Sequence, residues 1–545
     1  MYGSASPDNL NSPKRPVNAR IPANLLESVP AASVLRQDRR RHDIRFLLSS
    51  LFSALLVGGA FIFLGYDSPA LPLILLAVVA TPILLWRFRT LPVYIALISA
   101  CLFELFPSPH ADEFTGKTFF FLNINSIFQS KGMSMEGIPI SIFEVILITA
   151  GISSLTQAIF GKRVGLRLGM SFPALATYLL MVGLNYARGW ADGSDYHIML
   201  QEVRAQVYLA ITYLMALNMV EDRRDIGRVF WFSALCIGFK GILYTYRRYI
   251  TLGNGPISDQ GVGSHEEAFF FNCFVLLLLA LWLGQHQRRL IKWMWLLLPT
   301  TLLGFLATNR RAGTAGIIVA VPVIILAAYR ALPERRRFAA IVGIAMLTAG
   351  PIYYQIFKNS PSQIAQPARA IRSHFEPDER DSGSNAYRDA ENANIMATVK
   401  ESLPTTLFGF GYGKPFLKVA KMVDIGNLYD KWDILPHNQI LWIWMRTGFV
   451  GLLSFFALIA TGIFACSEIL RRRESDDRDI RTLAMWGMGV LVMLVVFGLL
   501  DLQISNYRNM IFVGMLLGLI EGFRQRTCNP SEHENAIVPV PAGSQ

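Results

Sequence analysis

Residues 267–337 read EAFFFNCFVLLLLALWLGQHQRRLIKWMWLLLPTTLLGFLATNRRAGTAGIIVAVPVIILAAYRALPERRR. This stretch contains three successive apolar runs, each long enough for a helix to cross a hydrocarbon core about 30 Å thick. Clusters of basic residues and the short turn Asn309-Arg310-Arg311 separate the runs. The pattern therefore predicts membrane-spanning helices joined by short connections.

Apolar runs of this kind recur along the whole chain of 545 residues, of which 52% are hydrophobic and only 17% are charged. Soluble domains carry roughly 25% charged residues, so a soluble enzyme, a nucleic-acid binder and a disordered scaffold are poor interpretations. We expect an all-α polytopic membrane protein with about 14 transmembrane helices, or 12–14 because two runs are weak. The predicted spans lie near 46–65, 70–86, 91–106, 139–160, 170–187, 202–219, 229–246, 267–284, 292–308, 312–329, 338–356, 438–465, 482–500 and 509–523.

The distribution of basic residues predicts the topology. If the N-terminus is cytoplasmic, every inner turn carries Lys or Arg, as the positive-inside rule requires. The net charge of +12 is therefore interpreted as a topology signal and not as the mark of a nucleic-acid partner. The predicted organisation is a disordered cytoplasmic tail (1–45), transmembrane helices 1–11 (46–356), one large periplasmic loop (357–436), transmembrane helices 12–14 (437–523) and a second cytoplasmic tail (524–545).

A few polar residues on the predicted outer side are candidates for chemistry. They are Arg204, Arg310, Arg311, Arg388 and His437. An arginine near lipid depth is costly unless it is paired or faces water, and an imidazole titrates near neutral pH and can take a proton from a hydroxyl. Structural alternatives stay open: each arginine can be a membrane anchor, Arg204 can pair with Glu202, and His437 can be a helix cap or an interface residue.

The stretch around His437 resembles the signature of a known family. The string His437-Asn438-Gln439-x-Leu441, followed by Gly448-x-x-Gly451 and preceded by a long outer loop, is similar to that of the O-antigen ligase and Wzy-type polymerase superfamily. Further matches are Ser384-x-x-x-Arg388, Pro404-x-x-x-Phe408-Gly409-x-Gly411-x-Gly413 and Asn309-Arg310-Arg311-Ala312-Gly313, so that the resemblance covers about residues 300–455. Where the family often carries an acidic residue, this chain has Arg446, for which a buried acidic or backbone partner is expected.

The resemblance implies a bacterial inner-membrane glycosyltransferase with a GT-C-like fold. Such enzymes transfer a glycan from undecaprenyl pyrophosphate to an acceptor hydroxyl on the periplasmic side. The resemblance implies His437 as the catalytic base, and Arg204 with Arg311, or Arg310 in its place, as the pair that binds the pyrophosphate. Candidates for glycan or loop contacts are Arg388, Tyr387, Asn438, His265 and Glu267. The chain has no His/Cys spacing typical of a metal site, so a reaction without a metal or another cofactor is predicted.

The expected function is polymerisation of polysaccharide repeat units, with inversion at the reacting carbon, for O-antigen or exopolysaccharide. An O-antigen ligase or a protein O-oligosaccharyltransferase would use the same donor and stays open as an alternative. A lipid-linked glycan flippase is an alternative of a different class, but transporters are expected to show internal repeats and a polar midplane cavity. The expected partners are the lipid-linked donor, a glycan acceptor and the bilayer; a chain-length regulator and a flippase are candidates for further partners.

Overall fold

The computed structural model describes residues 84–85, 87–104, 115, 120–121, 123, 140–160, 166–253, 262–263, 266–423, 432–472 and 477–528. These residues all belong to one compact unit, Leu56–Gln545. The predicted cytoplasmic tail 1–45, the first predicted span, most of the second span and His265 lie outside the described residues.

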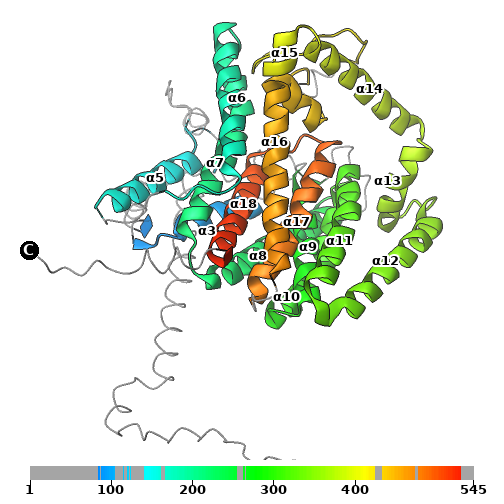
Figure 1. Cartoon of the computed structure of the whole chain (residues 1–545). Coiled ribbons are helices and arrows are strands. Elements are labelled where there is room, and N and C mark those ends of the chain that lie inside the picture. Colours follow the sequence, from blue (N-terminus) through cyan, green and yellow to red (C-terminus); the bar gives the residue numbers. More distant parts are fainter. Residues whose placement is uncertain are drawn as a thin grey trace, which may run out of the picture. The chain divides into compact units, whose positions relative to one another are not determined.

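Within these ranges the regular secondary structure is helical, apart from one isolated β-bridge between Asn123 and Ser141. The prediction of an all-α protein is confirmed for this part of the chain. The helices, labelled in Figure 1, are α3 (Leu91–Leu102), α5 (Ile142–Phe160), α6 (Phe172–Ala191), α7 (Tyr196–Met219), α8 (Arg223–Tyr246), α9 (Glu267–Gly284), α10 (Arg288–Ala307), α11 (Arg311–Ala331), α12 (Arg336–Phe357), α13 (Gln366–Phe375), α14 (Glu379–Val399), α15 (Leu403–Phe408), α16 (Gln439–Arg471), α17 (Arg478–Gly498) and α18 (Tyr507–Cys528).

Several helices are long and apolar enough to cross a membrane. Among the described residues there are seven, judged by length and composition: Arg223–Thr251, Glu267–Gly284, Arg288–Ala307, Arg311–Ala331, Pro333–Phe357, Gln439–Arg471 and Arg478–Gly498. These helices indicate a multi-pass membrane protein. The total of about 14 spans and the GT-C-like fold stay predictions. Helix α7 coincides with a predicted span, but polar residues such as Glu202 and Gln206 lower its hydropathy.

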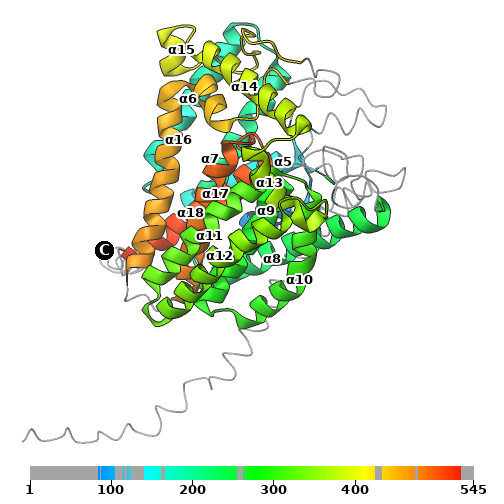
Figure 2. The same ribbon diagram turned by 90° about the vertical axis from the view of Figure 1, so that its right-hand side faces the viewer.

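The large loop predicted at 357–436 contains helices of its own. Helices α13, α14 and α15 lie in it, and Figures 1 and 2 show α12, α13 and α14 following one another as an arm beside the central helices. Contacts fix this arm to the central helices, because α12 and α13 pack against α11 and α14 packs against α16. The loop therefore covers the starts of α11 and α16.

Helix α16 consists of two helices joined at Gly448, whose backbone (φ 71°, ψ 179°) is not helical. The stretch after the kink, 449–471, is about 34 Å long at 1.5 Å per residue, enough to span a bilayer core. The stretch before it, 439–447, is a separate short helix. His437 therefore precedes this short helix, whereas the sequence placed it directly at the start of a span near 438–465.

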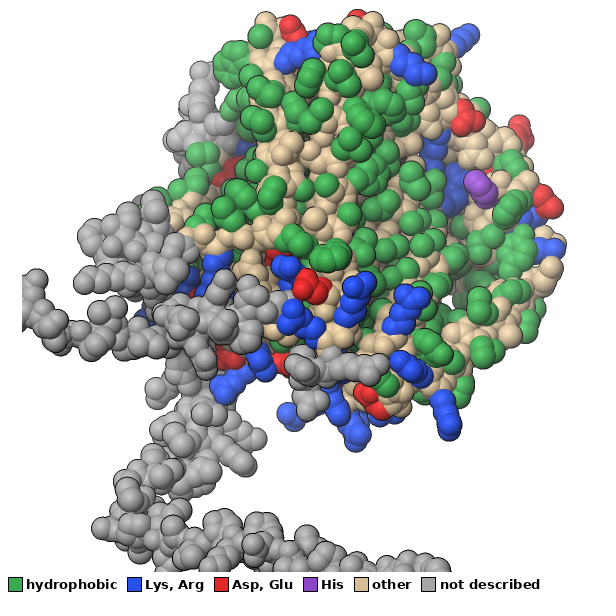
Figure 3. All heavy atoms as spheres, viewed as in Figure 1, with side chains coloured by type: hydrophobic (Ala, Val, Ile, Leu, Met, Phe, Trp, Pro, Cys, Tyr) green, Lys and Arg blue, Asp and Glu red, His purple; other side chains and the backbone are tan. Residues whose placement is uncertain are grey.

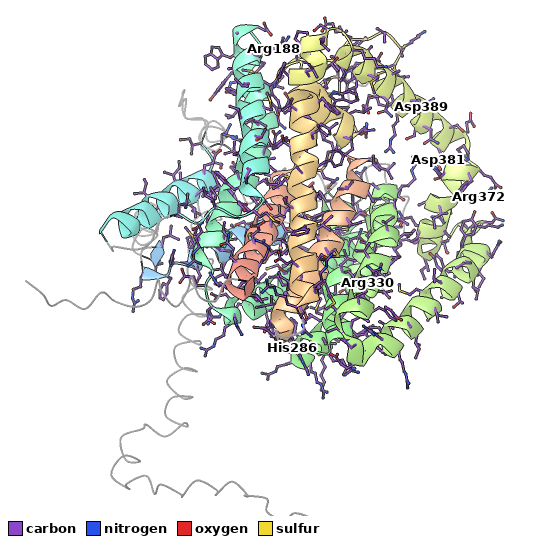
Figure 4. The ribbon with its side chains drawn as sticks, viewed as in Figure 1. Arg188, His286, Arg330, Arg372, Asp381 and Asp389 are labelled. Carbon is purple, nitrogen blue, oxygen red and sulfur yellow. The ribbon has the colours of Figure 1, made fainter. Side chains whose placement is uncertain are left out.

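Basic side chains gather at one end of the long helices. Figure 3 shows Lys and Arg side chains along the lower edge, below a broad band of apolar side chains. Figure 4 labels Arg330 and His286 at this end and Arg188 at the opposite one. Arg330 lies in the last turn of α11, Arg335 precedes α12, and Arg336 is the first residue of α12. The connection between α9 and α10 and the end of α11, two of the basic inner turns predicted from the sequence, thus lie at one end of the bundle.

Candidate functional site

The segment before α16 is held by its own polar side chains. Asn438 caps the short helix, because its Oδ1 accepts hydrogen bonds from the backbone N–H of Ile440 (3.0 Å) and Leu441 (3.2 Å). Asparagine is a preferred residue at this position, since it satisfies amide groups that have no partner within the helix. His437 is thereby fixed immediately outside a capped helix start.

A carboxylate on α14 engages His437. The backbone N–H of His437 donates to Oε2 of Glu391 (2.9 Å), and ring atom Nδ1 lies 3.2 Å from both oxygens of the same carboxylate. The Glu391 side chain is only 1% exposed, whereas that of His437 is 39% exposed. One edge of the imidazole is therefore tied to the protein, while much of the ring stays open to a ligand.

The turn between α10 and α11 meets the same helix, α14. Arg311, the first residue of α11, forms an ion pair with Asp381 (Nη1 to Oδ1, 3.2 Å) and donates to Oγ of Ser384 (Nη2, 3.3 Å). It also donates to Oγ of Ser373 on α13 (3.3 Å). Figure 4 shows Asp381 and Asp389 on α14 and Arg372 on α13 in this arm.

The residues of α14 that meet these groups lie on one face of the helix. Asp381, Ser384, Arg388 and Glu391 follow one another at spacings of three or four residues, which places side chains one above another. Seven residues separate Ser384 from Glu391, a rise of about 10 Å. One face of α14 therefore places the contacts to Arg311 and to His437 about 10 Å apart, with Arg388 between them.

Arg388 is a half-buried cation in this row. Burial lowers its pKa, and the neighbouring Arg311 lowers the pKa further, while Asp501, Glu391 and Asp381 act in the opposite direction. A guanidinium nevertheless stays charged at any physiological pH. Within the described ranges, no hydrogen bond or ion pair to Arg388 is formed. A half-buried charge of this kind is suited to binding an anion.

Arg310 adds a second guanidinium at the α10–α11 turn. Burial lowers its pKa as well; Asp501 and Glu266 oppose this change and Arg388 adds to it. The turn itself depends on Asn309, whose φ of 52° is a conformation that asparagine tolerates better than most residues. Arg388 thus interacts electrostatically with both Arg310 and Arg311, and Figure 3 shows Lys and Arg side chains set into the surface between the helix bundle and the arm.

Arg204 of α7 has an acidic partner of its own. Its Nε lies 3.1 Å from Oε1 of Glu144 on α5, and its Nη2 lies 3.5 Å from Oε2. The alternative pairing with Glu202, which the sequence left open, is wrong, because Glu202 accepts instead from Nε of Arg446 (2.7 Å). Before Arg204 can hold a phosphate, the phosphate must share it with Glu144 or displace that carboxylate.

The connection between α17 and α18 joins the Arg204 segment to the His437 segment. The backbone N–H groups of Gln503 and Ile504 donate to Oε1 of Gln439 (3.1 and 3.0 Å), two residues after His437. Tyr507, at the start of α18, donates to the carbonyl of Gln201 on α7 (3.4 Å). The two segments are therefore linked through this connection.

Comparison with known proteins identifies the region that contains most of these residues. A family model described as Wzy_C, O-antigen ligase, matches residues 295–456. Residues 295–456 are therefore similar to the O-antigen ligase family. The match confirms the resemblance predicted over about 300–455, and a comparison with curated proteins finds no match. The family indicates a membrane enzyme of the polysaccharide ligase or polymerase kind, acting on a lipid-linked glycan and an acceptor.

Arg446, which lies within the matched residues, has the buried partners that the sequence predicted. Besides Glu202, it donates to the carbonyl oxygens of Gly411 (2.8 Å), Lys414 (2.9 Å) and Ile434 (3.1 Å). The side chains of Arg446 and Glu202 are both 0% exposed. The pair fastens the glycine-rich loop after α15 to the short helix that follows His437.

Two glycines of the O-antigen ligase signature permit a close approach of two backbones. Gly448 has φ +71°, and a Cβ there would lie 2.3 Å from the carbonyl oxygen of Leu407. Gly409 has φ +101°, and its Cβ would lie 2.4 Å from the carbonyl oxygen of Arg446. Only glycine adopts such conformations without strain. The signature glycines therefore seat the end of α15 against the kink of α16.

The remaining predicted residues lie in different surroundings. The ring of Tyr387 meets that of His437 edge-on, with centroids 6.1 Å apart. Glu267 is fully buried and forms ion pairs with Lys240 (3.2 Å) and Arg508. The structure thus brings Tyr387, Arg388 and Arg311 towards His437 through α14, and Asn438 follows His437 in the chain. Glu267 and Arg204 are engaged in ion pairs elsewhere.

The sequence did not single out Glu391. It lies in a charged loop, and its contact with His437 is 46 positions away along the chain. A signal was nevertheless available, because Asp381, Ser384, Arg388 and Glu391 form a polar row at helical spacing. Such a row indicates one functional face of a helix.

Proposed function

We propose that this chain polymerises polysaccharide repeat units at the periplasmic face of the bacterial inner membrane, by moving a glycan from undecaprenyl pyrophosphate to an acceptor sugar hydroxyl. The observation that carries the proposal is the single face of α14 that contacts Arg311 at one position and His437 about 10 Å further along. A cation for the leaving group and a base for the acceptor are the two groups that such a transfer requires.

The proposed reaction is one displacement. Nε2 of His437 takes the proton of the acceptor hydroxyl, and the hydroxyl oxygen forms a bond to the anomeric carbon of the donor glycan. The bond between that carbon and the phosphate oxygen breaks, and its electron pair leaves with undecaprenyl pyrophosphate. Attack opposite to the leaving group inverts the carbon, and the imidazolium then releases its proton to water.

The proposed pyrophosphate site consists of Arg388 and Arg311, with Arg310 beside them. Guanidinium groups bind phosphate oxygens through two parallel hydrogen bonds and keep their charge. Arg311 already points its donors at Asp381 and Ser384 on α14, so a diphosphate placed there would exchange weak contacts for stronger ones. Arg204 is proposed as a further phosphate ligand, which it becomes when the diphosphate competes with Glu144.

Glycan contacts are proposed for Tyr387 and Asn438, the residues next to His437 in space and in sequence. The ring of Tyr387 offers an apolar face, and the Nδ2 of Asn438 offers a donor beside the proton acceptor. His265 and Glu267 stay proposals for orienting the acceptor. Because Glu267 is buried in ion pairs, it would act through those partners.

The proposed placement in the membrane follows the positive-inside rule. The end rich in Lys and Arg would face the cytoplasm together with both termini, and the arm with α13 to α15 would lie on the periplasmic side. The apolar, outward-facing α12, with Ile344 and Leu347 exposed, supports contact with lipid and with the polyprenyl chain of the donor. About 14 spans in a GT-C-like arrangement belong to the same proposal.

A ligase is the second candidate function, and the similarity of residues 295–456 to the O-antigen ligase family favours it. Gene deletion followed by analysis of surface polysaccharide separates the candidates. The polymerase proposal expects loss of long polymer with single repeat units retained. Polymer that accumulates on its lipid carrier would instead assign ligation, and loss of glycans from proteins would assign protein O-glycosylation. Donor trapped on the cytoplasmic leaflet would assign a flippase.

A further inference from the structure

The carboxylate of Glu391 is nearly inaccessible, and within the described part of the chain both groups that donate to it belong to His437. Burying a carboxylate costs free energy unless hydrogen bonds and charges compensate. Here both hydrogen-bonding groups belong to one residue, the same residue that is proposed as the base, and Arg388 adds a favourable charge. A buried charge arranged around a single histidine indicates a task connected with that histidine.

We propose that Glu391 is a positioning residue, which holds the imidazole of His437 with its proton on Nδ1 and so leaves Nε2 to take the proton of the acceptor. This inference rests on the proposed role of His437 as the base. Glu391 itself touches neither donor nor acceptor and takes no proton.

The hydrogen-bonding groups determine the tautomer. A neutral imidazole has one N–H donor and one acceptor nitrogen, and a carboxylate can only accept. Because Nδ1 of His437 lies 3.2 Å from both oxygens of Glu391, the proton belongs on Nδ1. The lone pair then lies on Nε2, at the opposite edge of the ring.

The same carboxylate also fixes the direction of the ring. Its Oε2 accepts from the backbone N–H of His437 at 2.9 Å while the two oxygens contact the ring. Rotation of the side chain would break the ring contact and leave the buried carboxylate with one donor. The ring is therefore oriented before the substrate arrives, which lowers the cost of reaching the reactive geometry.

Charge supplies a further reason. When His437 takes a proton, a positive imidazolium forms about one helical turn from Arg388, a residue that acts electrostatically on Glu391. The negative carboxylate between the two cations stabilises the imidazolium without receiving the proton, as the carboxylate does in a Ser-His-Asp triad. Glu391 thus reduces the electrostatic repulsion between the protonated His437 and the proposed phosphate-binding residue Arg388.

The test uses the full-length protein in lipid nanodiscs, with undecaprenyl-pyrophosphate-linked repeat units from the native host as donor and acceptor. Glu391→Gln keeps the shape of the side chain and an oxygen for the backbone N–H, but it removes the charge. We expect kcat to fall by about 10²–10⁴-fold, because replacing the carboxylate that orients the histidine of a Ser-His-Asp triad by its amide lowers kcat by about 10⁴-fold, with KM changed less than about threefold. Glu391→Asp should recover part of kcat, because the charge returns at a shorter reach.

Asp389→Asn is the matched control, since Asp389 is an exposed carboxylate on the same helix; its kcat should equal that of the wild type. A Glu391→Gln enzyme with wild-type kcat would overturn the inference. A Glu391→Gln enzyme whose kcat and melting temperature both fall, with neither recovered in Glu391→Asp, would also overturn it, because that pattern belongs to a purely structural contact. If His437→Ala is inactive while Glu391→Gln is normal, only this inference fails; an active His437→Ala enzyme would overturn the base assignment as well.

Discussion

Replacing Arg388 by alanine should slow glycan transfer without lowering the stability of the protein. Arg388 is half-buried, lies next to Arg311, and forms no hydrogen bond or ion pair within the described ranges. Burial and the neighbouring cation lower its pKa, which means that the folded protein disfavours its charged form relative to the unfolded chain. At neutral pH the charged residue therefore costs stability, and Arg388→Ala should melt at the same temperature as the wild type or higher.

The expected loss of activity follows from the charge. A guanidinium about 5 Å from a developing phosphate charge, in surroundings with an effective dielectric constant of about 20, contributes about 3 kcal/mol. Removing that contribution slows the reaction by about two orders of magnitude. Arg388→Lys should recover part of the rate, because lysine returns the charge without the planar pair of donors.

The assay compares kcat for glycan transfer and the melting temperature of the same purified samples. Arg372→Ala on α13 is the control, since Arg372 is 40% exposed and already pairs with Glu376 (3.2 Å), so its rate should not change. An Arg388→Ala enzyme that keeps its rate within about threefold would refute the anion-site assignment. A melting temperature of Arg388→Ala that lies several degrees below that of the wild type would refute the claim that Arg388 lowers the stability of the folded protein.

Three further predictions concern the frame of the site and its chemistry. Gly448→Ala should destabilise the protein by about 2–3 kcal/mol in a thermal melt, because it forces a Cβ against Leu407 at a positive φ; Gly350→Ala, where a Cβ meets nothing within 4 Å, should be neutral. Glu202→Gln should cost about 3–5 kcal/mol, because it leaves the Arg446 guanidinium buried without its carboxylate; equal melting of mutant and wild type would contradict this. A chelator should leave transfer unchanged, and activity lost and then restored by a divalent ion would exclude a metal-independent reaction.

Much of the helical frame could be predicted from the sequence. Apolar runs predict the long helices, because a hydrocarbon core requires continuous apolar length whatever packs beside it. Because a buried charge is costly without a partner, the sequence correctly predicted a buried partner for Arg446. The family signature identified the region later matched at 295–456. These predictions depend on local properties of the chain or on a motif, so no knowledge of the packing was required.

The ion pairs of the site could not be predicted in the same way. Arg204 finds Glu144 on a different helix, 60 positions away, although Glu202 is nearer along the chain. Residues two apart on a helix point in different directions, so the near neighbour was the poorer candidate for a partner. The kink at Gly448 was also not predicted, because its cause is the close approach of Leu407, a contact between segments distant in sequence.

The account depends most on His437 as the group that takes the acceptor proton. The direct test measures donor binding and single-turnover glycan transfer side by side for wild type and His437→Ala. Loss of a general base slows a reaction by about 10²–10⁴-fold, so the variant should bind the lipid-linked donor as well as the wild type and transfer its glycan at least about a hundredfold more slowly. Transfer at the wild-type rate by a variant that binds donor normally would contradict the account.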